Sequence, residues 1–128
     1  MDQLILHLIG DYCTQSDWHA ERKTKSLAVA GIHALLYSLP FLLIGSVQAV
    51  AVIFATHAVI DRYRLAVYLC YWKNRLFAPW TIKQAPFEEC HATGYDMSVK
   101  PPWMAVWLMI AADNTMHLTI NWLALRYL

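Results

Sequence analysis

Charged side chains are scarce in this sequence. Asp, Glu, Lys and Arg make up 15% of the 128 residues, whereas hydrophobic residues make up 59%. A small soluble domain has a high ratio of surface to volume, and soluble chains average about 25% charged residues. The formal net charge is only +1, so the sequence lacks the basic excess of a nucleic-acid-binding protein. The shortage of charge predicts membrane lipid as a partner and no nucleic acid.

Paired cysteines and the familiar catalytic motifs are also missing. The three cysteines, Cys13, Cys70 and Cys90, are odd in number and far apart, so they indicate neither a disulfide framework nor a zinc knuckle. The sequence has no serine-nucleophile motif, glycine-rich nucleotide-binding loop or catalytic cysteine pair. The candidates for chemistry are therefore its histidines and aspartates.

Apolar segments fill most of the chain. Three of them, 26–44, 46–70 and 101–125, approach the roughly 20 residues that a membrane-spanning helix needs, and segment 2–15 is shorter. We therefore predict an all-α fold, a single membrane-embedded domain over 1–128 with about four helices, the first short or tilted. Pro40 should kink the second helix, and Gly45 with Ser46 should form a tight turn after it.

A longer polar connection, 71–100, separates the last two apolar segments. Its aromatic residues suit a membrane interface, where an interfacial helix would cover about 71–77. Basic residues also gather between the first two segments, at Arg22, Lys23 and Lys25. Loops rich in Lys and Arg stay on the cytoplasmic side. The sequence thus predicts a multi-pass membrane protein with its basic loops in the cytoplasm.

Ionisable residues inside the apolar segments form a repeated pattern. Three times a histidine and an aspartate stand four residues apart: His7 with Asp11, His57 with Asp61, and Asp113 with His117. Four residues are about one helical turn, so each pair projects from one face of its helix and can chelate a divalent cation. Such groups are costly inside a membrane unless they find partners. We predict that these six residues are metal ligands.

Hydrolysis is the chemistry that such a site favours. Imidazole ligands point first to zinc, with manganese as the alternative, and a bound divalent ion activates water. Asp11, His33 and Asp61 are the candidates for catalytic roles. The expected substrate is an amphiphile that contains phosphate, such as a lipid phosphate, and a homo-oligomer is compatible with this function. The candidate substrate-binding residues are Gln15, Asp17, Lys23, Lys25, Arg62 and Asn114.

The start of the sequence resembles a known family. The run from His7 to Trp18 reads His-Leu-Ile-Gly-Asp-Tyr-Cys-Thr-Gln-Ser-Asp-Trp, and Lys23 and Lys25 follow it. It is similar to the opening signature of small bacterial and phage membrane proteins catalogued as domain of unknown function 3307. His33 and the two later His/Asp pairs continue the pattern. The chain is also similar in general pattern to small proteins labelled as predicted membrane-bound metal-dependent hydrolases, which implies the same site positions.

Other functions fit the same residues. Buried His and Asp groups also build proton relays and ion sites, so a metal- or proton-handling membrane protein is one alternative. The family resemblance also allows a non-catalytic phage or prophage factor that acts by protein contact, in exclusion or lysis control. A purely structural alternative is hydrogen bonding between helices. Asp61, for example, would then pair only with Arg62 and Arg64.

Overall fold

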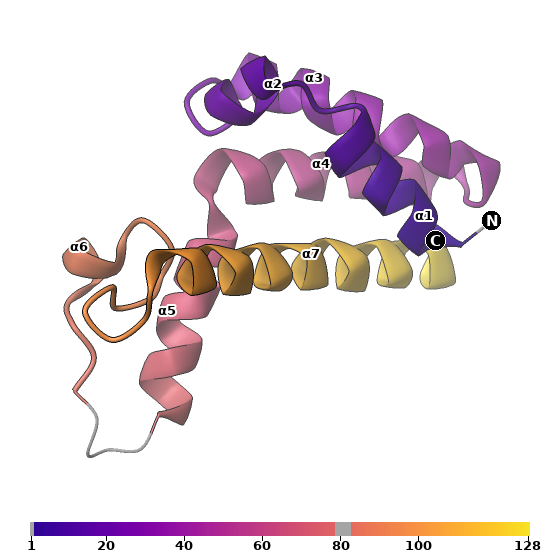
Figure 1. Cartoon of the computed structure of the whole chain (residues 1–128). Helices are drawn as coiled ribbons and strands as arrows, with labels where there is room; N and C mark the ends of the chain where they lie inside the picture. Colours follow the sequence, from indigo (N-terminus) through magenta and orange to yellow (C-terminus); the bar gives the residue numbers. More distant parts are fainter. Residues whose placement is uncertain (1, 79–82) are drawn as a thin grey trace. The chain divides into compact units, whose positions relative to one another are not determined.

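The computed structural model describes residues 2–78 and 83–128, which form helices joined by irregular connections and contain no strand (Figure 1). The prediction of an all-α chain is confirmed. In these same residues, no helix combines the length and the apolar character that a membrane crossing requires, so the predicted spanning helices are not supported. The helices are α1 (Gln3–Leu8), η1 (Ile9–Cys13), α2 (Asp17–Arg22), α3 (Leu27–Ser38), η2 (Leu39–Leu43), α4 (Val47–Tyr63), α5 (Leu65–Phe77), α6 (Phe87–Cys90) and α7 (Pro102–Tyr127).

The first segment is short, as predicted, and it changes its helical geometry halfway. Asp2 caps α1 by accepting a hydrogen bond from the backbone N–H of Leu4 at 3.1 Å. The chain then continues directly into η1, which is a π-helix. Such wide turns are rare, and many of them occur at functional sites because they change the direction of a side chain. Here the π-helix carries Asp11.

The second and third segments form a packed pair of helices. Pro40 has no backbone N–H and so cannot donate the hydrogen bond of an α-helix. α3 ends two residues before Pro40, and the 3-10 helix η2 follows it directly. A turn at residues 44–46 follows, and the hydroxyl of Ser46 accepts from the N–H of Ala49 at 3.1 Å. α3 and α4 then pack along each other (Figure 1). The predicted turn is confirmed, and at Pro40 the structure has a change from α-helix to 3-10 helix where the sequence predicted a kink.

The predicted helix 46–70 is broken in two. Arg64 has φ 53° and ψ 46°, the left-handed conformation, which ends α4 at Tyr63 and lets α5 begin at Leu65. α5 then runs on to Phe77, so the predicted connection begins too early. Residues 71–77 are helical, as predicted, but they form the end of α5 and not a separate helix. A short helix in this connection, α6, lies further along. These breaks give seven α-helices among the described residues instead of about four.

The chain forms two compact units. The first contains the residues up to Tyr63 together with Met116–Leu128, and the second contains Arg64–Thr115. The helix α7 contributes its first half to the second unit and its second half to the first. That these units constitute the single domain predicted from the sequence stays a prediction.

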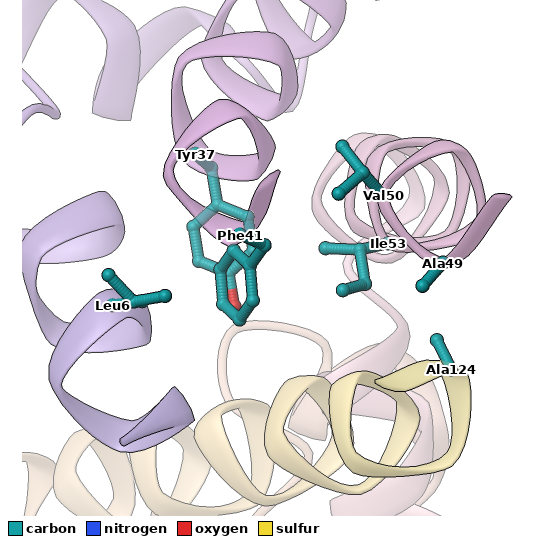
Figure 2. Packing of buried hydrophobic residues seen from close by; sticks show 7 residues of the cluster. All are labelled: Leu6, Tyr37, Phe41, Ala49, Val50, Ile53 and Ala124. Atoms are coloured by element: carbon teal, nitrogen blue, oxygen red, sulfur yellow. The ribbon is translucent and has the colours of Figure 1, made fainter. Parts of the chain in front are cut away.

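The core of the first unit brings together α1, α3, η2, α4 and the end of α7. Figure 2 shows its members, which are Leu6, Tyr37, Phe41, Ala49, Val50, Ile53 and Ala124. Tyr37, Phe41 and Ile53 are fully buried, and burying a side chain such as Phe or Ile contributes about 1.5–3 kcal/mol. The second unit has a separate core of Cys70, Tyr95 and Ala105. Both cores place α7 residues against the other helices of their unit.

Candidate metal centre

Four ligand atoms from three helices of the first unit lie close together. Nε2 of His57 is 3.1 Å from Nε2 of His33 and 3.1 Å from Oδ2 of Asp61. Oδ1 of Asp11 is 3.4 Å from each of the two imidazole nitrogens. Oδ2 of Asp61 is also 3.4 Å from Nε2 of His33. Five distances among these atoms therefore fall between 3.1 and 3.4 Å.

These distances match the edges of a small coordination tetrahedron. Zinc binds imidazole nitrogen and carboxylate oxygen at about 2.0–2.1 Å, so two ligands of a tetrahedral ion are about 3.3–3.4 Å apart. Ligand atoms lie within 4.8 Å of one another in two groups of three, Asp11/His33/His57 and His57/Asp61/His117. The buried His and Asp groups could therefore hold a metal ion.

Two further histidines contact the outer oxygens of the two carboxylates. Nδ1 of His7 is 3.4 Å from Oδ2 of Asp11, and Nε2 of His117 is 3.8 Å from Oδ1 of Asp61. The ring of His117 also stacks on that of His57, with 4.1 Å between the ring centroids. Both histidines are buried, with 0% and 2% of their surface exposed. His7 is in neither ligand group and is placed to orient Asp11, as the outer shell of a metal site commonly does, whereas His117 is itself a member of one ligand group.

Tyr37 joins the apolar core to this group of residues. Its hydroxyl accepts a hydrogen bond from Nδ2 of Asn121 at 2.6 Å and lies 2.7 Å from Nδ1 of His7. Its ring stacks on His57 with 3.7 Å between the centroids. Gly10 makes this approach possible, because a Cβ there would overlap the Tyr37 ring. Tyr37 was missed by the sequence analysis, and Asn121 was not among the predicted site residues; its spacing of four residues after His117 on α7 is a signal that could have identified it.

A lysine covers the exposed side of the cluster. Nζ of Lys23 is 2.9 Å from Oδ2 of Asp61, and 17% of the Lys23 side chain is exposed, against 4% for Asp61. Arg62 donates to the backbone carbonyl of Thr24 at 2.8 Å and so fixes the loop that carries this lysine. Arg64 donates to the carbonyl of Ala92. The charge partner of Asp61 is thus Lys23, and the alternative pairing with Arg62 and Arg64 is wrong.

The electrostatics of the cluster keep His57 neutral and the two carboxylates charged. Burial lowers the pKa of His57 to about 4, although its hydrogen bond to Asp61 acts in the opposite direction. Burial would raise the pKa of Asp61, but hydrogen bonds from His117 and His57 and the charge of Lys23 hold it well below its usual range. The pKa of Asp11 is lowered in the same way, with His33 as its main hydrogen-bond partner. Neutral imidazole and ionised carboxylate are the forms that bind a metal ion.

The remaining predicted site residues are more scattered. Asp113 and Asn114 lie on α7 in the second unit, and their predicted roles stay predictions. Asp17 and Lys25 are exposed, whereas Gln15 is half-buried and its Oε1 has no hydrogen-bond partner among the described residues. His19 lies on α2, with its ring centroid 6.4 Å from that of His33. It therefore belongs to the surroundings of the cluster.

The comparisons with known proteins agree with the resemblance seen in the sequence. The model of the family described as "Protein of unknown function (DUF3307)" matches residues 1–86. That range includes Asp11, His33, His57 and Asp61. No curated protein and no solved structure matches the chain, so the likeness to membrane-bound hydrolases stays a prediction. The chain belongs to the DUF3307 family.

Proposed function

We propose that this protein is a metal-dependent hydrolase that holds one divalent ion, most simply zinc, in the first unit. The observation that carries the proposal is the set of five distances of 3.1–3.4 Å among two imidazole nitrogens and two carboxylate oxygens. Their match to tetrahedral edges supports a bound ion over simple packing, because hydrogen bonds between helices do not require all the distances to be equal.

Catalysis needs an open coordination position, so the four residues should divide their roles. Catalytic zinc sites use three protein ligands, whereas sites with four are structural. We assign Asp11, His33 and His57 as ligands, since Asp61 is already paired with Lys23. When bound, the ion supplies Lewis acidity and activates water. Asp61 remains ionised and can accept a hydrogen bond from that water, which orients it for attack.

The position of Lys23 supports an anionic substrate. The ligand side chains are at most 10% exposed, and Lys23 is the more exposed group that touches them. An anion approaching from this side would meet the ammonium group before it met the carboxylates. A phosphate group would suit this contact, and the amphiphile predicted from the sequence stays the proposed substrate.

Exposed apolar side chains support attachment to a membrane. Five large apolar side chains are 43–51% exposed: Leu4, Ile5 and Leu8 on α1, and Ile32 and Leu35 on α3. Large apolar residues that gather on a surface commonly mark contact with a partner or with lipid. We propose lipid as the contact, because the chain has few charges to cover this surface. Fractionation of cells that express the chain should recover it with the inner membrane; recovery in the soluble fraction would contradict the attachment.

Metal analysis of the purified full chain tests the centre directly. We expect about one zinc per chain after purification in zinc-containing buffer. His57→Ala and Asp11→Asn should each lower the zinc affinity about 100-fold or more, because each removes a ligand. His91→Ala is the matched control, since His91 is exposed in the second unit. Absence of zinc, manganese and other divalent ions from the folded wild type would refute the centre.

Turnover then separates a hydrolase from a protein that only stores or moves metal. The contacts of Asp61 with both His33 and His57 favour the second candidate, because a fourth protein ligand would leave no position for water. Release of phosphate from lipid phosphates by the zinc-loaded protein, and its loss in Asp61→Asn with zinc still bound, would support hydrolysis. Stoichiometric zinc without turnover would instead favour metal handling.

A further inference from the structure

A second site lies in the other unit, where a partly open cavity of about 190 Å³ separates the end of α5 from the connection before α7. Cavities of about 150 Å³ accept a benzene-sized molecule. This cavity therefore has room for one ring and a few additional atoms. Its walls include the methyl groups of Ala78 and Val99 and the buried Tyr95.

The cavity carries a positive charge. Lys83 and Lys100 line it, and Lys73 donates a hydrogen bond to the Tyr95 hydroxyl at 2.9 Å. Both Lys73 and Lys100 also lie over the Tyr95 ring, 5.4 and 5.8 Å from its centroid. Asp96 is the carboxylate in the lining, and one of its oxygens accepts from the N–H and the hydroxyl of Ser98. Two ammonium groups line the cavity against one carboxylate, and this balance favours an anion.

One buried polar atom at the cavity has no hydrogen-bond partner in the part of the chain that the structure describes. Nε2 of Gln84 donates to the carbonyl of Tyr71 at 3.3 Å, which leaves its other amide atom, Oε1, as an acceptor. Oε1 is buried and has no hydrogen bond within the described residues. An unsatisfied buried acceptor costs about 1–3 kcal/mol. A ligand with a hydroxyl or amino group would supply the missing donor.

We propose that this cavity binds a small aromatic anion that carries one carboxylate or phosphate group and one hydrogen-bond donor. Lys83 and Lys100 would bind the anionic group, Tyr95 and Val99 would contact the ring, and Oε1 of Gln84 would accept from the donor. The site is separate from the proposed metal centre, so it neither requires nor tests the hydrolase function.

Calorimetric titration of the full chain with 4-hydroxybenzoate tests the proposal. A ligand of this size with one charged contact should bind with a Kd of about 1 mM or tighter. Methyl 4-hydroxybenzoate, which lacks the charge, should bind about tenfold more weakly or worse, and benzoate, which lacks the donor, about fivefold more weakly. Phenyl phosphate replaces the carboxylate and shows which of the two anionic groups the lysines prefer.

Variants assign the binding to this cavity. Lys83→Gln and Lys100→Gln should each weaken the binding of 4-hydroxybenzoate about fivefold to tenfold, and Gln84→Leu should abolish the advantage over benzoate. Arg126→Gln removes an exposed cation of the first unit and should leave this binding unchanged. Circular dichroism checks that each variant is folded; if Lys100→Gln is not, the exposed Lys83 decides. Equal binding of acid and methyl ester, or no binding of either anion, would overturn the proposal.

Discussion

The two units bury very different groups. In the first unit, six ionisable residues of the metal centre are at most 9% exposed, beside the apolar core around Phe41. The second unit buries Cys70, Tyr95 and Ala105, and its lysines lie around a cavity near the surface. Burying charged groups is unfavourable unless they are paired or bind a metal. We therefore expect the free energy of unfolding of the first unit to depend on pH and on bound metal. That of the second unit should depend on them much less.

The largest effect should come from the apolar core of the first unit. Phe41→Ala removes a fully buried ring and should lower the free energy of unfolding by about 3–5 kcal/mol. Hydrogen exchange should then speed up in α3 and α4 and leave the α5 amides protected. Equal loss of protection in α5 would break the comparison, because the two units would then unfold together.

Acid should destabilise the first unit selectively. The pKa of His57 is about 4 in the folded chain, against 6.5 for a free side chain. Protonation therefore favours the unfolded state, and stability should fall as the pH drops from about 6.5 to 4, by about 3 kcal/mol in the metal-free protein. The lowered pKa values of Asp11 and Asp61 extend the loss below pH 4.

Thermal melts of the metal-free protein between pH 7 and pH 4 measure this loss. His57→Gln should show a flatter dependence on pH over the same range, and His91→Ala should follow the wild type. An unchanged slope in His57→Gln would mean that another group titrates.

Removing the Tyr37 hydroxyl should lower both the stability of the first unit and its affinity for zinc. Tyr37→Phe keeps the ring against His57 but loses the contacts with His7 and Asn121. We expect a loss of about 1–2 kcal/mol in stability, since the amide of Asn121 loses a buried partner. Zinc affinity, measured by competition with a chelator, should fall severalfold. An unchanged affinity would limit the role of Tyr37 to packing.

The smallest effect should be a gain. Gly31 lies inside α3, and a Cβ built on it has no neighbour within 4 Å. Gly31→Ala should therefore stabilise the first unit by about 0.5–1 kcal/mol, because glycine is a poor helix former. Denaturant titration measures the gain, and zinc affinity should stay the same. Destabilisation would show that α3 contacts something at this face.

The sequence predicted the cluster of His and Asp residues better than it predicted the helices. The spacing of four residues placed His7 beside Asp11 and His57 beside Asp61, because one helical turn fixes that relation locally. His33 and Lys23 were also predicted as site residues. Their contacts with Asp61 depend on how α2 and α3 pack on α4, which no local pattern of the sequence encodes. Tyr37 was missed for the same reason, since it reads as an ordinary core residue.

The errors in helix boundaries also have local physical causes. Arg64 adopts a left-handed conformation that few residues other than glycine and asparagine favour, so nothing in the sequence marked the break between α4 and α5. The π-helix that carries Asp11 is equally unmarked, because its extra residue per turn leaves the apolar pattern almost unchanged. Pro40 and Gly45 were read correctly because their backbone restrictions do not depend on the rest of the chain.

The division of α7 between the units has a consequence for the order of events during protein synthesis. A ribosome must make the whole of the second unit before it makes His117, Asn121 and Ala124, which belong to the first. Until then the Tyr37 hydroxyl lacks Asn121, and Oδ1 of Asp61 lacks His117. Both atoms are therefore available to other partners. Completing the first unit then requires Met116–Leu128 to pack against the residues up to Tyr63, which brings together the two ends of Arg64–Thr115. This costs less chain entropy if Arg64–Thr115 has already folded. Translation speed through Arg64–Thr115 should thus influence how much of the protein reaches its native state.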